Sequence, residues 1–160
     1  AISVHDALRH LTPDVAAMLK WPNDVFVGGS KLCGMLLERS GDFVVIGIGV
    51  NITHAPAILD RPATSMRQLG CENIDAAMLL NALTVAFARW VEVWRTYGLG
   101  PTISAWMERA HPIGTALRAE LPDGSRLDGR YDGLDESGAL LLRLSDGSRH
   151  TIHAGDIFLK

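Results

Sequence analysis

Hydrophobic and polar positions follow several different periods along this chain of 160 residues. Near its start, apolar residues recur at helical spacing over 2–11, and the polar, proline-containing stretch 12–14 ends that pattern. An extended run at 15–20 is followed by two hairpin patterns, one at 25–32 and one at 32–51, each with glycine in its turn. This part of the chain therefore predicts one short helix and two successive β-hairpins.

Residues 75–110 change to a period of 3.6 and predict two helices. Asp75 suits the N-cap of the first helix, Gly98 its C-terminal end, and Pro101 the first turn of the second. The apolar face of the first helix is expected to form core, and it consists of Ala76, Leu79, Leu80, Leu83, Phe87, Trp90 and Trp94. The second is expected to bury Ile103, Trp106 and Met107. The preceding segment is irregular apart from a short helix predicted at 65–69.

Residues 113–160 carry short alternating strands separated by polar, glycine-containing turns at 122–124, 135–138 and 145–147. Turns at this regular spacing, with no helical pattern between them, predict a small β-barrel or meander. We therefore predict an α+β protein with two domains. Residues 1–112 form a mixed or antiparallel sheet with packed helices, and the remainder forms a small β domain.

Composition limits the class of protein. The chain is 48% hydrophobic and 21% charged with a formal net charge of −3, ordinary values for a soluble globular protein. A general nucleic-acid role is disfavoured because phosphate binding normally shows as a basic patch. We see no apolar run of about 20 residues and no signal-peptide pattern, so we expect a cytoplasmic protein without a membrane partner. Two cysteines, Cys33 and Cys71, make no disulfide framework.

The strand predicted at 43–51 has two unlike faces, because successive side chains point to opposite sides of a sheet. One face carries β-branched residues suited to a core, namely Val44, Ile46, Ile48 and Val50. The other ends in Gly47, Gly49 and Asn51. Glycine inside a strand often marks the close approach of a ligand or of backbone. Two interpretations stay open: a floor under a flat ligand with Asn51 bonding its polar edge, or close packing of another element.

Lys31 opens an otherwise apolar strand and supplies a compact charge suited to a carboxylate or phosphate. The alternative is a solvated lysine at a sheet edge. By simple alternation Gly34 faces away from Lys31. If both touch one ligand, a β-bulge near Cys33 or Gly34 is required, or Gly34 contributes through its backbone.

A cation, a rigid aromatic–proline corner, an amide and a carboxylate stand together in Lys20-Trp21-Pro22-Asn23-Asp24. Asn23-Asp24 alone could be an Asx turn leading into the next strand. Near Lys20 and Lys31, however, the Asp24 carboxylate could also hold a metal–phosphate group in register.

The chain resembles the biotin–protein ligases, also called biotin–[acetyl-CoA-carboxylase] ligases, in three blocks: Lys20-Trp-Pro-Asn-Asp24, Lys31-Leu-Cys-Gly34-Met-Leu-Leu-Glu38 and Gly47-Ile-Gly49-Val-Asn51. The resemblance covers nearly the whole chain. It implies a class II synthetase-like ligase core, incomplete here, followed by an SH3-like β-barrel. It also implies ATP-dependent ligation of biotin, through biotinyl-5′-AMP and with Mg²⁺, to a lysine of biotin carboxyl carrier protein, a subunit of acetyl-CoA carboxylase.

Roles for individual residues also follow from the resemblance. Lys31 would hold the biotin carboxylate and the α-phosphate together, and Gly34 would line the biotin site. Asp24 would orient or deprotonate the acceptor lysine, or hold Mg²⁺. The ATP and adenylate site would be formed by Lys20, Asn23, Gly47, Gly49 and Asn51.

One family segment, Gly-Arg-Gly-Arg-x-Gly upstream of the Lys20 block, is absent from this chain. We expect its absence to weaken adenylate binding and to expose the intermediate to hydrolysis. Two functions therefore stay open: the catalytic half of a ligase, or a truncated, non-catalytic relative that binds biotin, nucleotide or carrier protein. A homodimer formed through open sheet edges is a further alternative. Some family members also repress transcription through a helix-turn-helix, and no such motif is present here.

Overall fold

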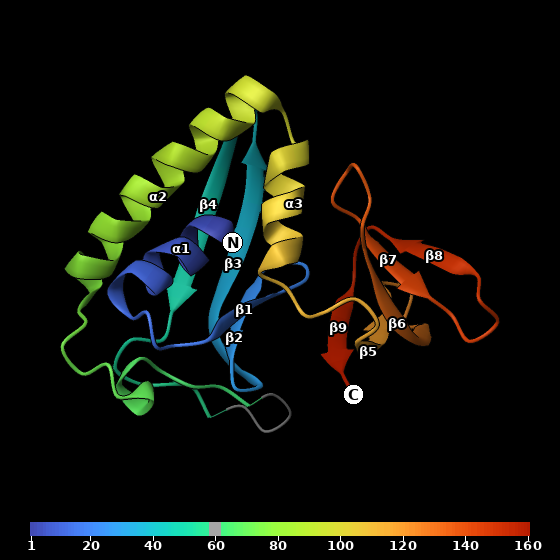
Figure 1. Cartoon of the computed structure of the whole chain (residues 1–160), viewed down its shortest axis with the longest axis horizontal. Coiled ribbons are helices and arrows are strands. Elements are labelled where there is room, and N and C mark those ends of the chain that lie inside the picture. Colours follow the sequence, from blue (N-terminus) through green and yellow to red (C-terminus); the bar gives the residue numbers. More distant parts are fainter. Residues whose placement is uncertain (58–61) are drawn as a thin grey trace. The chain divides into compact units, whose positions relative to one another are not determined.

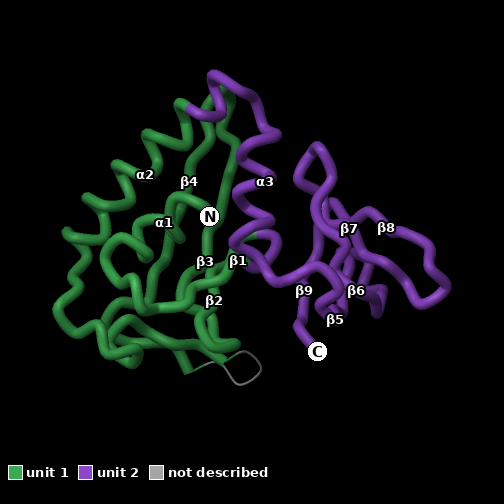
Figure 2. Tube along the Cα trace, viewed as in Figure 1, with its two compact units in different colours: residues 1–19, 23–92 green, residues 20–22, 93–160 purple. Residues whose placement is uncertain are grey.

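The computed structural model describes residues 1–57 and 62–160. The described chain divides into two compact units (Figure 2). The first consists of Ala1–Leu19 and Asn23–Glu92, and the second of Lys20–Pro22 and Val93–Lys160. The division thus passes through the Lys20–Asp24 block.

A four-stranded sheet in the order β1-β2-β3-β4 lies in the first half of the chain (Figure 1). The two predicted hairpins are confirmed, because β3 pairs antiparallel with both β2 and β4. The predicted helices at the start and before residue 98 are confirmed as well. The elements are α1 (Ile2–Leu11), β1 (Ala17–Lys20), β2 (Asp24–Val27), β3 (Ser30–Ser40), β4 (Phe43–Val50), the 3-10 helix η1 (Arg67–Leu69) and α2 (Ala76–Tyr97).

The core of this sheet lies under α1. Val25, Cys33 and Met35 share one sheet face by their register and are buried. Helix α1 lies over this sheet with Ile2, Val4 and Leu8 buried (Figure 1), and it covers this face because Gly47 and Gly49 on the other face are exposed. By alternation, the opposite face carries Asp24, Gly34 and the two glycines of β4.

The prediction that one face of β4 and one face of α2 form core is wrong for most of the residues named. Val44 and Ile46 are exposed, and no residue of β4 is buried. In α2 only Leu79 is buried, whereas Leu80 and Trp94 are 62% and 55% exposed. Periodicity identifies which side chains share a face, but it carries no information on whether another element covers that face. In the described residues β4 is the last strand of its sheet, with a partner on one side alone.

Helix α2 also qualifies the expectation that no segment could cross a membrane. By length and average hydropathy alone its 22 residues would suffice. Core helices of soluble proteins meet the same criterion, and polar side chains such as Asn81, Arg89 and Glu92 interrupt this one. The length and hydropathy of α2 therefore do not identify it as a membrane-spanning helix.

The second half of the chain forms a five-stranded antiparallel sheet in the order β8-β7-β6-β5-β9. The predicted polar turns join its strands, and aspartates at 123, 135 and 146 each accept hydrogen bonds from a serine two residues later. Trp106 is buried as expected, while Ile103 and Met107 are half-buried. The elements are α3 (Gly100–Glu108), β5 (Ala116–Glu120), β6 (Arg126–Leu134), β7 (Leu140–Arg143), β8 (Arg149–Ile152) and β9 (Asp156–Leu159).

Candidate functional site

A β-bulge in β3 brings Lys31 and Gly34 onto one face. Phe26 pairs with Lys31 and Val25 with Cys33, so Leu32 has no partner on β2. The extra residue reverses the alternation between Lys31 and Gly34. A Cβ built on Gly34 would lie 2.9 Å from both Cε and Nζ of Lys31. The structure therefore contains the β-bulge that is needed for Lys31 and Gly34 to face the same side of the sheet.

The Lys31 ammonium is held by the carboxylate of Asp24. Lys31 Nζ lies 2.5 Å from Asp24 Oδ1, and Asp24 is buried whereas the lysine side chain is 31% exposed. Because Asp24 pairs directly with Gly34 across the β2–β3 ladder, the carboxylate is fixed by the sheet rather than by a loop. The pair presents a cation at the surface of the sheet, supported from below by a buried anion.

A strip free of side chains extends from this ion pair across the sheet. Gly34 is the register partner of Gly49, and Gly47 faces the same side one pair further along, opposite Leu36. A Cβ at Gly49 would meet nothing closer than the Gly34 carbonyl oxygen at 3.8 Å. The strip is open to solvent, so a flat group could lie on it with one end against the ammonium.

Asn23 and Asn51 are both bound to neighbouring backbone. Asn23 Nδ2 donates to the backbone carbonyl of Met35, and the backbone carbonyl of Asn23 accepts from Met35 N at 2.9 Å. Asn51 Nδ2 donates to the carbonyls of Thr64 at 3.0 Å and Lys31 at 3.4 Å. The two asparagines thus anchor opposite sides of the strand that carries Lys31.

Lys20 belongs to the second unit together with Trp21 and Pro22. Its ammonium lies 5.9 Å from the ring centroid of Phe158, and the indole of Trp21 donates to the Gly138 carbonyl at 3.1 Å. Burial, and to a lesser extent the Lys20 charge, lowers the pKa of His111. The five-residue block therefore supplies Asp24 to the first sheet and its first three residues to the second unit.

Metal-binding groups are few in the described ranges, where no group of three or more His, Cys, Asp or Glu side chains could hold a metal ion. Asp24 is the one carboxylate at the ion pair, and Lys31 already occupies one of its oxygens. Mg²⁺ normally keeps several waters and uses one or two carboxylates plus substrate phosphates. These residues do not form a metal cage.

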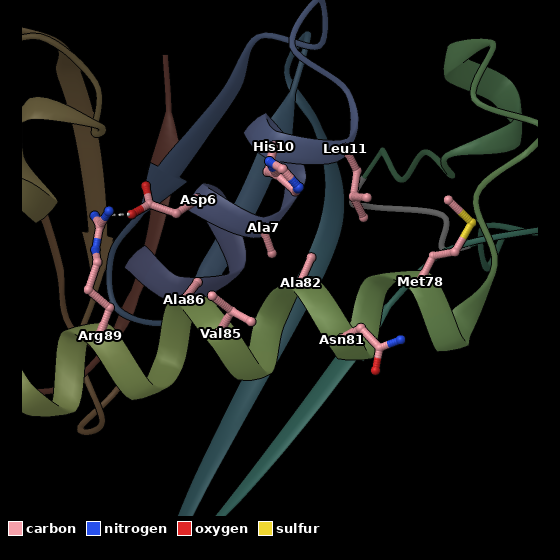
Figure 3. Close-up of a pocket in the computed structure, with 10 residues that line it drawn as sticks. All are labelled: Asp6, Ala7, His10, Leu11, Met78, Asn81, Ala82, Val85, Ala86 and Arg89. Atoms are coloured by element: carbon pink, nitrogen blue, oxygen red, sulfur yellow. Dashed lines mark hydrogen bonds and ion pairs between the residues drawn. The ribbon is translucent and has the colours of Figure 1, made fainter.

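A groove of about 540 Å³ lies between α1 and α2 (Figure 3). Asp6 and Arg89 form an ion pair of 3.1 Å at one end of it, and Trp90 Nε1 also donates to Asp6. None of the predicted site residues lines this groove, and α1 covers the Cys33 face of the sheet rather than the glycine face. Its lining residues are Asp6, Ala7, His10, Leu11, Met78, Asn81, Ala82, Val85, Ala86 and Arg89.

Cys33 should be an unreactive thiol, because burial raises its pKa to about 11 from an ordinary value of 9.0. A shift of two units makes the thiolate roughly a hundredfold scarcer at pH 8. Alkylation with iodoacetamide should therefore modify Cys71 first and reach Cys33 only as the pH approaches 11. Because the folded pKa is raised, the free energy of unfolding should also fall as pH rises from 9 through 11. Equal labelling rates at pH 8, read by peptide mass spectrometry, would contradict the burial of Cys33.

Two protein-family models together match nearly the whole chain. The model of the biotin/lipoate A/B protein ligase family matches residues 1–108, and that of the biotin protein ligase C terminal domain matches residues 113–160. The chain is 37% identical to the biotin–[acetyl-CoA-carboxylase] ligase of Paracoccus denitrificans, covering 99% of this chain and 70% of that protein. It is 36% identical to the ligase of the same name from Mycobacterium tuberculosis, covering 98% and 59%.

A solved structure, biotin protein ligase from Aquifex aeolicus in complex with biotin and ATP, superposes with a TM-score of 0.85. Sequence identity there is 24%, and the match covers 99% of this chain and 68% of that one. The chain belongs to the biotin protein ligases of the biotin/lipoate A/B protein ligase family. It spans about three fifths to seven tenths of the length of these relatives.

The sequence did not indicate the segment that runs beside Lys31. Ala63 forms a parallel bridge with Lys31, and Thr64, Ser65 and Met66 are buried behind it. One signal was present: Ser65 and Gln68 have the spacing of a capping box, and each bonds the other.

Proposed function

We propose that the protein to which this chain belongs ligates biotin to a lysine of biotin carboxyl carrier protein in two steps. In the first, a biotin carboxylate oxygen attacks the α-phosphorus of ATP, forming biotinyl-5′-AMP and releasing pyrophosphate. In the second, the acceptor lysine amine attacks the acyl carbon, loses a proton and releases AMP. The observation that carries this proposal is the Lys31–Asp24 pair at the end of the glycine strip, in a chain of this family.

Lys31 supplies the positive charge that the first step needs. Two anions must approach one another, and a cation already oriented between them stabilises the charge that develops in the transition state. The ammonium is partly exposed on the open face, whereas its counter-ion Asp24 is buried below it. Biotin bound at Gly34 would place its carboxylate at Lys31.

The adenylate would lie along the rest of the strip. Gly47 and Gly49 leave room for a flat purine or ribose against the backbone of β4. Asn51 borders the strip with its amide nitrogen already bonded to backbone, and Asn23 stands on the other side of β3. We propose Lys20 as a further phosphate-binding cation and Mg²⁺ as the ion that accompanies ATP.

Residues 1–112 would form part of the catalytic domain and 113–160 the C-terminal domain, in agreement with the ranges of the two family models. We place the protein in the cytoplasm with carrier protein as its partner. Homodimerisation would use the open edge of β4.

The test combines the chain with biotin, MgATP and apo carrier protein, both alone and with a polypeptide spanning the region that the Paracoccus ligase has beyond this match. Carrier biotinylation in either mixture, read by streptavidin blot and mass spectrometry, is the expected result. Binding of biotin or ATP without biotinylation in either mixture would favour a non-catalytic binding module and overturn the proposal.

Gly34→Ala should disturb the ion pair without unfolding the chain. The added methyl would lie 2.9 Å from the Lys31 ammonium and 3.4 Å from Asp24 Oδ1. Because the nearest atoms end a flexible side chain, the lysine moves and the fold is retained. We expect biotinyl-5′-AMP formation to fall about tenfold at an unchanged melting temperature.

The matched control is Gly100→Ala, since a Cβ there meets nothing within 4 Å. Its rate of adenylate formation should equal that of the wild type. A Gly34→Ala protein with wild-type adenylate formation would show that Gly34 does not limit the position of Lys31.

A further inference from the structure

Residues 62–66 form a short extended segment, the strap, which is hydrogen-bonded along the Lys31 end of β3. Lys31 N donates to the Pro62 carbonyl at 2.8 Å, and Thr64 N donates to the Lys31 carbonyl at 2.9 Å. Both backbone groups of Lys31 are thus bonded to the strap, while Phe26 stays its register partner on β2. The strap takes up the pairing with β3 where β4 ends, next to the register shift between β2 and β3.

The strap is fixed on its other side by buried side chains. Ser65 and Met66 are each 0% exposed, and Met66 N donates to the Asn51 carbonyl at 2.9 Å. Ser65 N and Oγ both donate to Gln68 Oε1, at 3.0 and 3.2 Å, and Gln68 N donates back to Ser65 Oγ. The Ser65–Gln68 lock therefore holds the strap from a point that touches neither Lys31 nor the glycine strip.

We propose that the strap positions Lys31, and that Ser65 and Gln68 are positioning residues for the adenylation step. The ladder between β3 and β4 ends at Cys33, so the backbone of Lys31 needs another hydrogen-bonding partner on that side of β3 to keep one orientation. The strap supplies that partner, and the lock keeps the strap in place. This inference rests on the proposed function for its catalytic meaning, but the positioning itself is measurable without turnover.

The variants are Ser65→Ala, which removes one side of the lock, and Gln68→Leu, which removes the other. Gln68→Glu retains an oxygen that can accept from Ser65 and serves as the conservative rescue. Ser148→Ala is the matched control, because Ser148 makes a comparable serine–side-chain bond to Asp146 in the second sheet.

Two readouts need no activity. Amide hydrogen exchange at Lys31 and Thr64 should become about tenfold faster in Ser65→Ala and Gln68→Leu, with exchange along β5–β9 unchanged. The side-chain ammonium of Lys31 is one of three lysine signals, beside Lys20 and Lys160. Its NMR resonance should shift toward the free-lysine position in both variants and return in Gln68→Glu.

The kinetic readout is biotinyl-5′-AMP formation by the mixture that supports biotinylation. The variants should lower kcat about tenfold with little change in KM for ATP or biotin, because the lysine is misplaced while the strip is intact. Unchanged exchange at Lys31 and Thr64, acceleration throughout both sheets, or faster local exchange with wild-type kcat would each overturn the proposal. If no mixture makes adenylate, the exchange and NMR results still decide the positioning while the proposed function fails.

Discussion

Lys31→Gln is expected to reduce biotinyl-5′-AMP formation about 10³-fold, equivalent to about 4 kcal/mol of transition-state stabilisation. Glutamine keeps hydrogen-bonding capacity and similar length but removes the charge that would offset two approaching anions. It also leaves the buried Asp24 carboxylate without its cation. The measurement is pyrophosphate release from ATP and biotin, with biotin binding by calorimetry to separate affinity from chemistry.

Lys160→Gln is the matched control for this result. Lys160 Nζ also pairs with an aspartate, Asp128 Oδ2 at 2.7 Å, but both side chains are exposed and lie in the second unit. Removing that charge should leave pyrophosphate release unchanged. An equal loss in both variants would mean that general destabilisation, rather than charge at the strip, explains the effect of Lys31→Gln.

Asp24→Asn is expected to slow transfer of biotin from preformed biotinyl-5′-AMP to carrier protein about 10²-fold. The acceptor lysine must lose a proton to attack, and Asp24 is the carboxylate beside the Lys31 end of the strip, where we propose the reaction takes place. Asparagine preserves the shape and still accepts from Lys31, so adenylate formation should fall less than transfer. Single-turnover assays of the two half-reactions measure this difference.

The corresponding control is Asp128→Asn, which removes an aspartate paired with both Lys160 and Arg118. Transfer should proceed there at the wild-type rate. If Asp24→Asn also transferred biotin from preformed adenylate at the wild-type rate, the proposed role of Asp24 in the second step would be wrong.

Much of the geometry of the candidate site could be predicted from the sequence because its determinants are local. The glycine positions in β4 follow from alternation, and the need for a bulge follows from the spacing of Lys31 and Gly34. The pairing of Asp24 with Lys31 follows once the Gly28-Gly29 turn sets the hairpin. In each case residues fewer than twelve positions apart determine the geometry.

The remainder depends on contacts that periodicity does not encode. The expected core faces of β4 and α2 were wrong because coverage depends on elements elsewhere in the chain or outside it. The bond from Trp21 to Gly138 joins residues 117 positions apart. The strap lies in an irregular segment. Its backbone pairs with Lys31, and no pattern of side chains in the sequence predicts that pairing.

The edge position of β4 has a thermodynamic consequence for ligand affinity. We expect a strand with no buried residue, two glycines and one unpaired edge in the described sheet to open locally at a small cost in free energy. A nucleotide that binds only the ordered strand must shift that local equilibrium, so its apparent affinity is reduced by the fraction of molecules in which β4 is open. The bound nucleotide would then stabilise β4 in the sheet. A second molecule that also ordered β4 would bind cooperatively with the nucleotide, because each would lower the ordering cost of the other.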